Sequence, residues 1–386
     1  MQGPTRRGFL AGSAATAAVA STRRPAAQDG PIRVGANLEF SGGLELFGNQ
    51  ARLGLDLAAS EINAAGGILG RPVEILYEDN RTDPKTAVER STKLIGRDQV
   101  LAVVGPITSN GRDAIAPTHT RQKVPLLYAT NYEGSACGRY IFCFNTVPNQ
   151  ELARLVPRLA TEKGDSFYMF GADYVWPQKM FEAAEKLVAG LGGRSLGKEF
   201  TPWGVKEFTP VVRRIKESGA KVLLFALPGA DGITFIRQAE DLGLLDDVTV
   251  GFLGFCEPYL GAFGDGKGQD MWVAVPLVNS STEPEVQDFV ARARATTAAE
   301  TPISHYVLTH YNALMATRAA QEKVGRVDRE ALVDGLAGLT IDSPTGPMSI
   351  GADHHVTLGM YLARTAGGGL ETVEALGRLA PESGCG

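Results

Sequence analysis

The chain has 386 residues, of which 44% are hydrophobic and 21% are charged, and its formal net charge is −5 at pH 7. This composition is typical of a soluble globular protein and excludes disordered and fibrous chains. The basic residues are scattered, which argues against a nucleic-acid-binding surface or a polybasic membrane patch. The length favours two domains, and a small ligand is the expected partner.

The first thirty residues predict an export signal. An arginine pair, Arg6-Arg7, precedes an Ala-rich apolar run over residues 8–20. This is the layout of a signal peptide, and the paired arginines favour the twin-arginine type. The run is too short to span a bilayer as a helix. We therefore expect residues 1–30 to be a signal peptide and linker, and the mature protein to be a soluble protein of the periplasm.

From Pro31 onward, apolar runs of strand length alternate with segments of helical period. Strands are predicted at 32–40, 73–77, 101–104 and 125–129, with helices at 46–65, 83–97 and 111–122. Because strands joined by helical crossovers run parallel, these units predict one parallel sheet.

A second β/α series begins after residue 147. Its strands are predicted at 166–171, 221–227 and 248–255, and a further strand at 270–277 leaves the series. Two helical segments, about 283–300 and 304–325, then follow without a strand between them, so the chain is expected to return to the first lobe. Short antiparallel strands are predicted at 346–350 and 359–363.

The predicted fold class is therefore α/β with two lobes. We assign residues 31–147 plus 278–348 to lobe 1, residues 148–277 plus 349–366 to lobe 2, and residues 367–386 to a flexible tail.

Export would allow the four cysteines, Cys137, Cys143, Cys256 and Cys385, to form disulfides. Cys137 and Cys143 are the expected pair, since a bridge between them closes a short loop and contributes about 2 kcal/mol. Cys256 lies in a hydrophobic stretch and is expected to be a buried thiol. Cys385 falls in the Gly-rich tail, where no fixed structure is expected.

No catalytic or metal-binding motif is found in the sequence. The five histidines form neither an HExxH pair nor a Cys/His set with zinc spacing, and His305 and His310 suit ordinary helix positions. There is no GxSxG elbow, no P-loop and no GxGxxG fingerprint between a strand and a helix. We expect a protein that is not an enzyme and that uses no metal and no cofactor.

Polar residues follow the carboxyl ends of the predicted parallel strands, where open α/β sheets bind their ligands. In lobe 1, Thr108 and Ser109 begin a helix, so their hydroxyls and the free amides of the first turn can point at one ligand oxygen. Ser109 equally suits a simple helix cap. Tyr128 and Thr130 lie at the end of the next strand.

In lobe 2, strand ends deliver Asp173, Tyr174, Asp231 and Glu257. Ionised carboxylates accept hydrogen bonds and suit ligand N–H groups, whereas the donors of lobe 1 suit a carbonyl or carboxylate. The ligand is therefore expected to carry both kinds of group. Each of these acids taken alone is as well explained by a surface cap or a salt bridge.

Residues 61–71, Glu-Ile-Asn-Ala-Ala-Gly-Gly-Ile-Leu-Gly-Arg, followed by Asp79 and Asp83-Pro84, closely resemble the amino-terminal signature of type I periplasmic binding proteins of the branched-chain amino acid (Leu/Ile/Val-binding) family. Further segments resemble the urea and short-chain amide branch of that family. They are Tyr-Glu-Gly at 132–134, Pro-Asn-Gln at 148–150, Gly-Ala-Asp-Tyr-Val-Trp-Pro at 171–177 and Glu-Phe-Thr-Pro at 199–202.

This resemblance implies two Rossmann-like lobes joined by a three-strand hinge, closing on a solute that is passed to an ABC permease and its ATPase. The implied ligand is urea, a short-chain amide or a related small polar solute. A branched-chain or other amino acid, or a role as a ligand sensor of the amide-regulator type, remains the alternative. The chain differs from the urea branch at Pro106-Ile107 and at 129–131. The implied ligand contacts are Ser109, Tyr128, Thr130, Asp173, Tyr174 and Glu257.

Overall fold

The computed structural model describes residues 1–3, 30–298 and 300–385. The predicted twin-arginine signal peptide falls almost wholly on residues 4–29, outside the described residues. Residues 31–386 pack as one unit, which contains two sheets.

The first sheet is parallel and has the strand order β2-β1-β3-β4-β5, as the β/α alternation predicts. A helix follows each of the first three strands, and it covers the sheet that those strands form. The strands are β1 Ile32–Leu38, β2 Val73–Asp79, β3 Val103–Val104, β4 Leu126–Tyr128 and β5 Ile141–Cys143. The helices are α1 Glu45–Ala64, α2 Pro84–Gly96 and α3 Ser109–Gln122.

The second sheet has the order β11-β12-β13-β10-β9-β8-β6-β7, and β14 pairs with β13. Strands β6 to β10 run parallel, whereas β13 is antiparallel to both β10 and β14. The strands are β6 Ser166–Ala172, β7 Arg194–Thr201, β8 Val222–Ala226, β9 Thr249–Phe252, β10 Trp272–Val275, β11 Thr340–Ile341, β12 Met348–Ile350, β13 Val356–Ala366 and β14 Gly369–Leu379. The helices of this part are α4 Pro148–Glu162, α5 Val175–Gly190, α6 Thr209–Ser218, α7 Gly229–Asp241 and α8 Pro258–Phe263.

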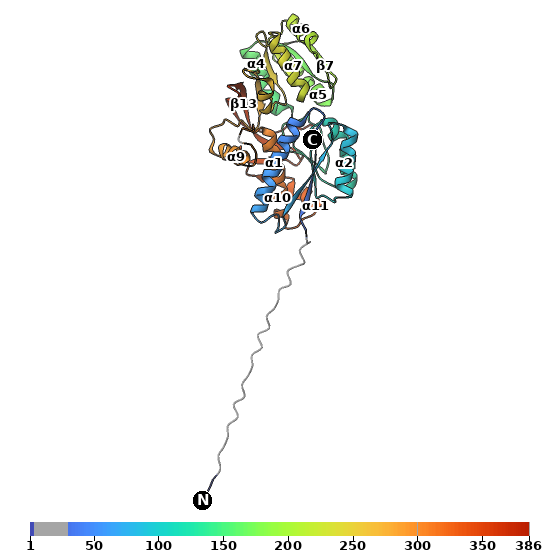
Figure 1. The fold of residues 1–386 in the computed structure, drawn as a ribbon, viewed down its shortest axis with the longest axis vertical. Helices are drawn as coiled ribbons and strands as arrows, with labels where there is room; N and C mark the ends of the chain where they lie inside the picture. Colours follow the sequence, from blue (N-terminus) through green and yellow to red (C-terminus); the bar gives the residue numbers. More distant parts are fainter. Residues whose placement is uncertain (4–29, 299, 386) are drawn as a thin grey trace. The chain divides into compact units, whose positions relative to one another are not determined.

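After β10 the chain returns to the first lobe through α9 Pro284–Ala295, α10 His305–Val324 and α11 Arg329–Leu336. Helix α10 packs against α1 and α11. Figure 1 shows α1, α2, α10 and α11 gathered in one lobe, and α4, α5, α6 and α7 gathered in the other. The fold is therefore α/β with two lobes, as predicted.

The central strands of the second sheet are buried throughout. Every residue of β6 and of β8 is buried. Such strands need apolar side chains on both faces, because helices cover both sides of a parallel sheet. This explains why they stand out in the sequence as continuous apolar runs rather than as alternating ones.

The chain after residue 366 is not a flexible tail. Residues 369–379 form β14, which pairs with β13 along its length. Beyond β14, the amide of Ser135 donates to the carbonyl of Ser383 at 2.6 Å, which ties the terminal segment to the first lobe. The prediction failed because β14 is largely exposed and its apolar positions are interrupted by polar residues and glycines, so it has no apolar run.

The disulfide joins Cys137 to Cys385, not to Cys143. Cys143 lies within β5 with its side chain in the core, where it is a free thiol. Burial raises the pKa of this thiol to about 12, so it stays protonated. Sequence spacing suggested the shorter loop, but the β-strand turns Cys143 away from Cys137. Cys256 is a buried free thiol, as predicted.

Candidate ligand-binding site

A small pocket lies where the two lobes meet. The first lobe supplies residues from the segments after β1, β3 and β4 and from the start of α10. The second lobe supplies residues that follow β6, β8 and β9. The lining residues are Leu44, Phe47, Ile107, Ser109, Thr130, Asn131, Tyr174, Trp176, Pro228, Gly254 and Tyr306.

The segment between β3 and α3 is held in place by a buried carboxyl group. Glu39 accepts hydrogen bonds from the amides of Ile107 at 2.8 Å and Thr108 at 3.1 Å, and from the Thr108 hydroxyl at 3.2 Å. Burial raises the pKa of Glu39, and these hydrogen bonds oppose that rise. Glu39 thereby fixes the backbone that carries Ser109 into the pocket.

Ser109 is hydrogen-bonded to a residue that does not itself line the pocket. Its hydroxyl donates to Glu133 at 2.7 Å, and Glu133 forms an ion pair with Arg112 at 2.6 Å. The two charged side chains are only 6% and 4% exposed. The Arg112 guanidinium also lies over the rings of Tyr128 and Tyr132. The buried Glu133–Arg112 ion pair thus holds the Ser109 hydroxyl in a fixed orientation.

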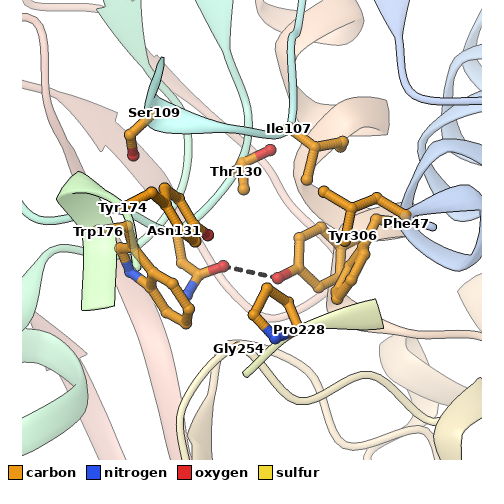
Figure 2. A pocket seen from close by; sticks show the side chains of 11 residues that line it. Phe47, Ile107, Ser109, Thr130, Asn131, Tyr174, Trp176, Pro228, Gly254 and Tyr306 are labelled. Carbon is orange, nitrogen blue, oxygen red and sulfur yellow. Dashed lines mark hydrogen bonds between the residues drawn. The ribbon is translucent and has the colours of Figure 1, made fainter. Parts of the chain in front are cut away.

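Aromatic rings form two walls of the pocket. Phe47 and Tyr306 meet edge to face with their centroids 4.9 Å apart, and Tyr174 and Trp176 lie 6.2 Å apart. Figure 2 shows the first pair on one side of the pocket and the second pair on the other. Ring surfaces of this kind make favourable contacts with flat or apolar groups.

The first wall is assembled by a contact between two helices. The side chain of Gln50, on α1, donates to the carbonyl of Pro302 and accepts from the amide of Ser304, each at 2.9 Å. These bonds hold the start of α10 against α1. Phe47 and Tyr306 consequently meet, although 259 positions separate them in the chain (306 − 47).

Three buried polar atoms at the pocket have no hydrogen-bond partner among the described residues. They are Thr130 Oγ1, Asn131 Nδ2 and Trp176 Nε1. Asn131 Oδ1 accepts a hydrogen bond from the Tyr306 hydroxyl at 2.6 Å, so Nδ2 of the same amide group is directed away from that hydroxyl. A buried polar group left unpaired costs roughly 1–3 kcal/mol. A ligand that pairs these atoms would recover that free energy.

Of the eight site residues predicted from sequence, the structure brings Ser109, Thr130 and Tyr174 to the pocket. Thr108 instead caps α3, accepting from the amide of Gly111 at 3.3 Å. Tyr128 donates its hydroxyl proton to the carbonyl of Ile107 at 2.8 Å and so stabilises the segment between β3 and α3.

The two predicted aspartates lie outside the pocket. Asp173 is exposed and accepts from the side chain of Gln178 at 2.8 Å. Asp231 accepts from the amide of Gly204 at 2.6 Å and pairs with Lys206 at 3.4 Å. Both therefore stabilise local structure in the second lobe.

Glu257 is buried but does not line the pocket. Neither carboxyl oxygen has a hydrogen-bond partner among the described residues. Burial raises the pKa of Glu257 to about 8, so the side chain is mostly neutral at pH 7.

The lobes touch directly beside the pocket. The amide of Ala230, at the start of α7, donates to the carbonyl of Gly43, in the segment after β1, at 3.0 Å. Gly229 has φ of +73°, and a Cβ added there would overlap the Gly43 oxygen. Only glycine permits this approach of one lobe to the other.

Eight lining residues were not selected from the sequence: Leu44, Phe47, Ile107, Asn131, Trp176, Pro228, Gly254 and Tyr306. Most of them lie just beyond a strand's carboxyl end, so the rule that located Ser109 applied to them too. The search for polar groups passed over most of them because, apart from Asn131, they are mainly apolar. Tyr306 has no such signal, since it reaches the pocket only through the packing of α10 on α1.

Within residues 1–3, 30–298 and 300–385, no helix is long and apolar enough to cross a membrane. The same residues contain no group of three or more His, Cys, Asp or Glu side chains that could hold a metal ion.

Known proteins resemble this chain over most of its length. A protein described as Leu/Ile/Val-binding protein homolog 7, from Brucella abortus, is 25% identical over 354 residues, covering 87% of each chain. A solute binding protein from R. palustris, solved in complex with benzoate, has a TM-score of 0.83 at 20% identity, covering 92% of this chain and 99% of that one. A branched-chain amino acid transporter substrate binding protein from Streptococcus pneumoniae, in complex with isoleucine, has a TM-score of 0.79 at 23% identity, covering 89% and 99%.

At these identities the solved structures show a shared fold. The family evidence comes from the sequence itself, because the family described as periplasmic binding protein matches residues 31–369. Members of this family bind solutes and are not enzymes. With its two α/β lobes and a pocket between them, the chain belongs to the periplasmic binding protein family.

Proposed function

We propose that this protein is the extracytoplasmic substrate-binding component of an ABC importer, and that it binds an uncharged small polar solute of the urea or short-chain amide type. The solute is held between the lobes and passed to a membrane permease with its ATPase. Export by the twin-arginine route, from the Arg6-Arg7 segment, is part of this proposal.

The observation that carries the proposal is the character of the pocket lining. No charged side chain is among the described residues that line it, yet three buried polar atoms there lack partners. Burying an ion without a counter-charge is costly, whereas a neutral amide supplies both N–H and C=O groups. The segments at 132–134 and 171–177, which resemble the amide branch, agree with this choice.

An amino acid is the second candidate, and one observation favours it. The carboxyl group of Glu257 is buried and unpaired, and in its ionised form it would suit an ammonium group. The Brucella relative is named as a Leu/Ile/Val-binding protein homolog. This reading requires the lobes to rearrange so that Glu257 reaches the pocket.

A thermal-shift screen of the purified protein separates these candidates, because a ligand that binds the folded state raises the melting temperature. The panel contains urea, formamide, acetamide, leucine, isoleucine and benzoate. A shift with urea or amides, confirmed by calorimetry, supports the proposal. A shift with leucine or isoleucine alone assigns the second candidate. If no solute changes the melting temperature, the proposed class of solute is wrong.

A further inference from the structure

We propose that the preferred ligand is a neutral primary carboxamide carrying a flat apolar group, and that Glu133 sets this preference by making Ser109 a hydrogen-bond acceptor. This inference rests on the proposed function, since it concerns the same pocket. It goes further by assigning the polarity of one contact and the shape of the rest of the ligand.

The polarity follows from the single proton of the Ser109 hydroxyl. That proton is donated to Glu133, whose carboxylate is held by Arg112 in a buried ion pair. An ionised carboxylate accepts hydrogen bonds and cannot donate one back. Ser109 therefore presents only lone pairs to the pocket, and its ligand partner must be an N–H or O–H group.

The surroundings of Ser109 disfavour a ligand carboxylate for a second reason. The amides of Ile107 and Thr108, which would otherwise be donors for an anion at the start of α3, already bond Glu39. A carboxylate of the ligand would therefore meet the acceptor oxygen of Ser109 without the help of these two amide donors.

Donors are available elsewhere in the same pocket. The Asn131 Nδ2 amide and the Trp176 Nε1–H lack partners among the described residues. These neutral groups suit the carbonyl oxygen of a carboxamide whose NH₂ group bonds Ser109. A primary amide thus matches both kinds of partner without burying a net charge.

The remaining walls specify what the amide is attached to. Phe47 and Tyr306 on one side and Tyr174 and Trp176 on the other present ring surfaces to the pocket (Figure 2). Urea and formamide have no group that would contact these rings. A planar apolar substituent that enters between these rings would gain hydrophobic and aromatic contact.

Benzamide and benzoate test this inference, because they share a ring and differ in the amide or carboxylate group. Titration calorimetry of the protein with each is expected to show benzamide binding at least tenfold more tightly, since one unmatched buried polar group lowers affinity by about that factor. Acetamide tests the contribution of the ring and is expected to bind at least tenfold more weakly than benzamide.

Three variants test the roles of the residues. Ser109→Ala removes the acceptor, so benzamide is expected to lose about tenfold in affinity while benzoate changes little. Glu133→Gln frees the Ser109 proton and leaves Arg112 without its buried partner, so the benzamide-to-benzoate preference is expected to fall at least tenfold. Asp113→Asn is the matched control: it removes the other carboxylate on Arg112, which is 55% exposed, and is expected to leave the preference unchanged.

Circular dichroism and melting curves establish that each variant is folded; if Glu133→Gln does not fold, Ser109→Ala decides. Equal or tighter binding of benzoate by the parent protein overturns the inference and, with it, the proposal of an uncharged solute. Binding of acetamide or urea without benzamide overturns the inference and leaves the proposed function standing, whereas binding of leucine alone overturns both. An unchanged preference in both Ser109→Ala and Glu133→Gln also overturns the inference. If no member of either panel binds, both proposals fail.

Discussion

Gly229→Ala is expected to weaken ligand binding by hindering contact between the lobes. Gly229 begins α7 in the second lobe, and a Cβ there would overlap the carbonyl oxygen of Gly43 in the first lobe. That carbonyl also accepts the Ala230 amide at 3.0 Å. The overlap exists only when the lobes touch, so it acts on the closed form.

The size of the effect follows from two terms. Displacing Gly43 would break the hydrogen bond from Ala230, a loss of about 0.5–1.5 kcal/mol. Moving packed backbone to relieve the overlap adds a similar amount, so closure is opposed by about 1–3 kcal/mol, or roughly 5- to 150-fold in affinity. The backbone strain of Ala at φ of +73° is present in both forms and lowers stability rather than affinity.

Calorimetry with the best solute of the screening panel measures the affinity, and small-angle scattering with and without that solute measures closure. Gly261→Ala is the control, because its added Cβ meets nothing within 4 Å and the residue lies in the same lobe. The variant at 229 is expected to stay more open in the presence of solute. If it binds and closes like the parent protein, the Gly43–Ala230 contact does not take part in closure.

Two further predictions concern stability. Cys385→Ser should remove a cross-link between residues 248 apart and lower the free energy of unfolding by about 3–5 kcal/mol. Peptide mapping of the parent protein should find Cys137 linked to Cys385. A peptide in which Cys137 is linked to Cys143 would contradict the structure. Glu257→Gln should become more stable than the parent as pH rises. Burial holds the pKa of Glu257 at about 8, against 4.5 in its ordinary state, so the free energy of unfolding of the parent falls progressively between about pH 4.5 and pH 8. Guanidinium unfolding at pH 5 and pH 8 measures this, with a few kcal/mol expected at pH 8 and little at pH 5; an equal difference at both values would mean that Glu257 is not neutral in the folded protein.

The parallel β/α units could be predicted because their signals are local. Apolar runs marked β1, β6 and β8, which are buried in the sheets. Strands β7 and β14 were missed for the converse reason: each has only one fully buried residue and is interrupted by polar residues, so no apolar run marks them. Edge strands need only backbone partners, and the sequence alone does not identify those partners.

The candidate site was only partly predictable. The rule that ligands bind beyond strand ends located Ser109, Thr130 and Tyr174. It does not distinguish neighbours such as Asp173 and Tyr174, of which the first is exposed and the second is buried at the pocket. Which of two successive side chains faces inward depends on how the second lobe docks against the first.

The sequence by itself determined the two α/β lobes and the family, because short-range periodicity and segment motifs do not depend on distant residues. The tertiary structure alone decided the disulfide between Cys137 and Cys385, the meeting of Phe47 with Tyr306, and the commitment of the Ser109 proton to Glu133. Each of these contacts depends on the packing of helices, strands and loops on one another, and residue types and spacings do not specify that packing.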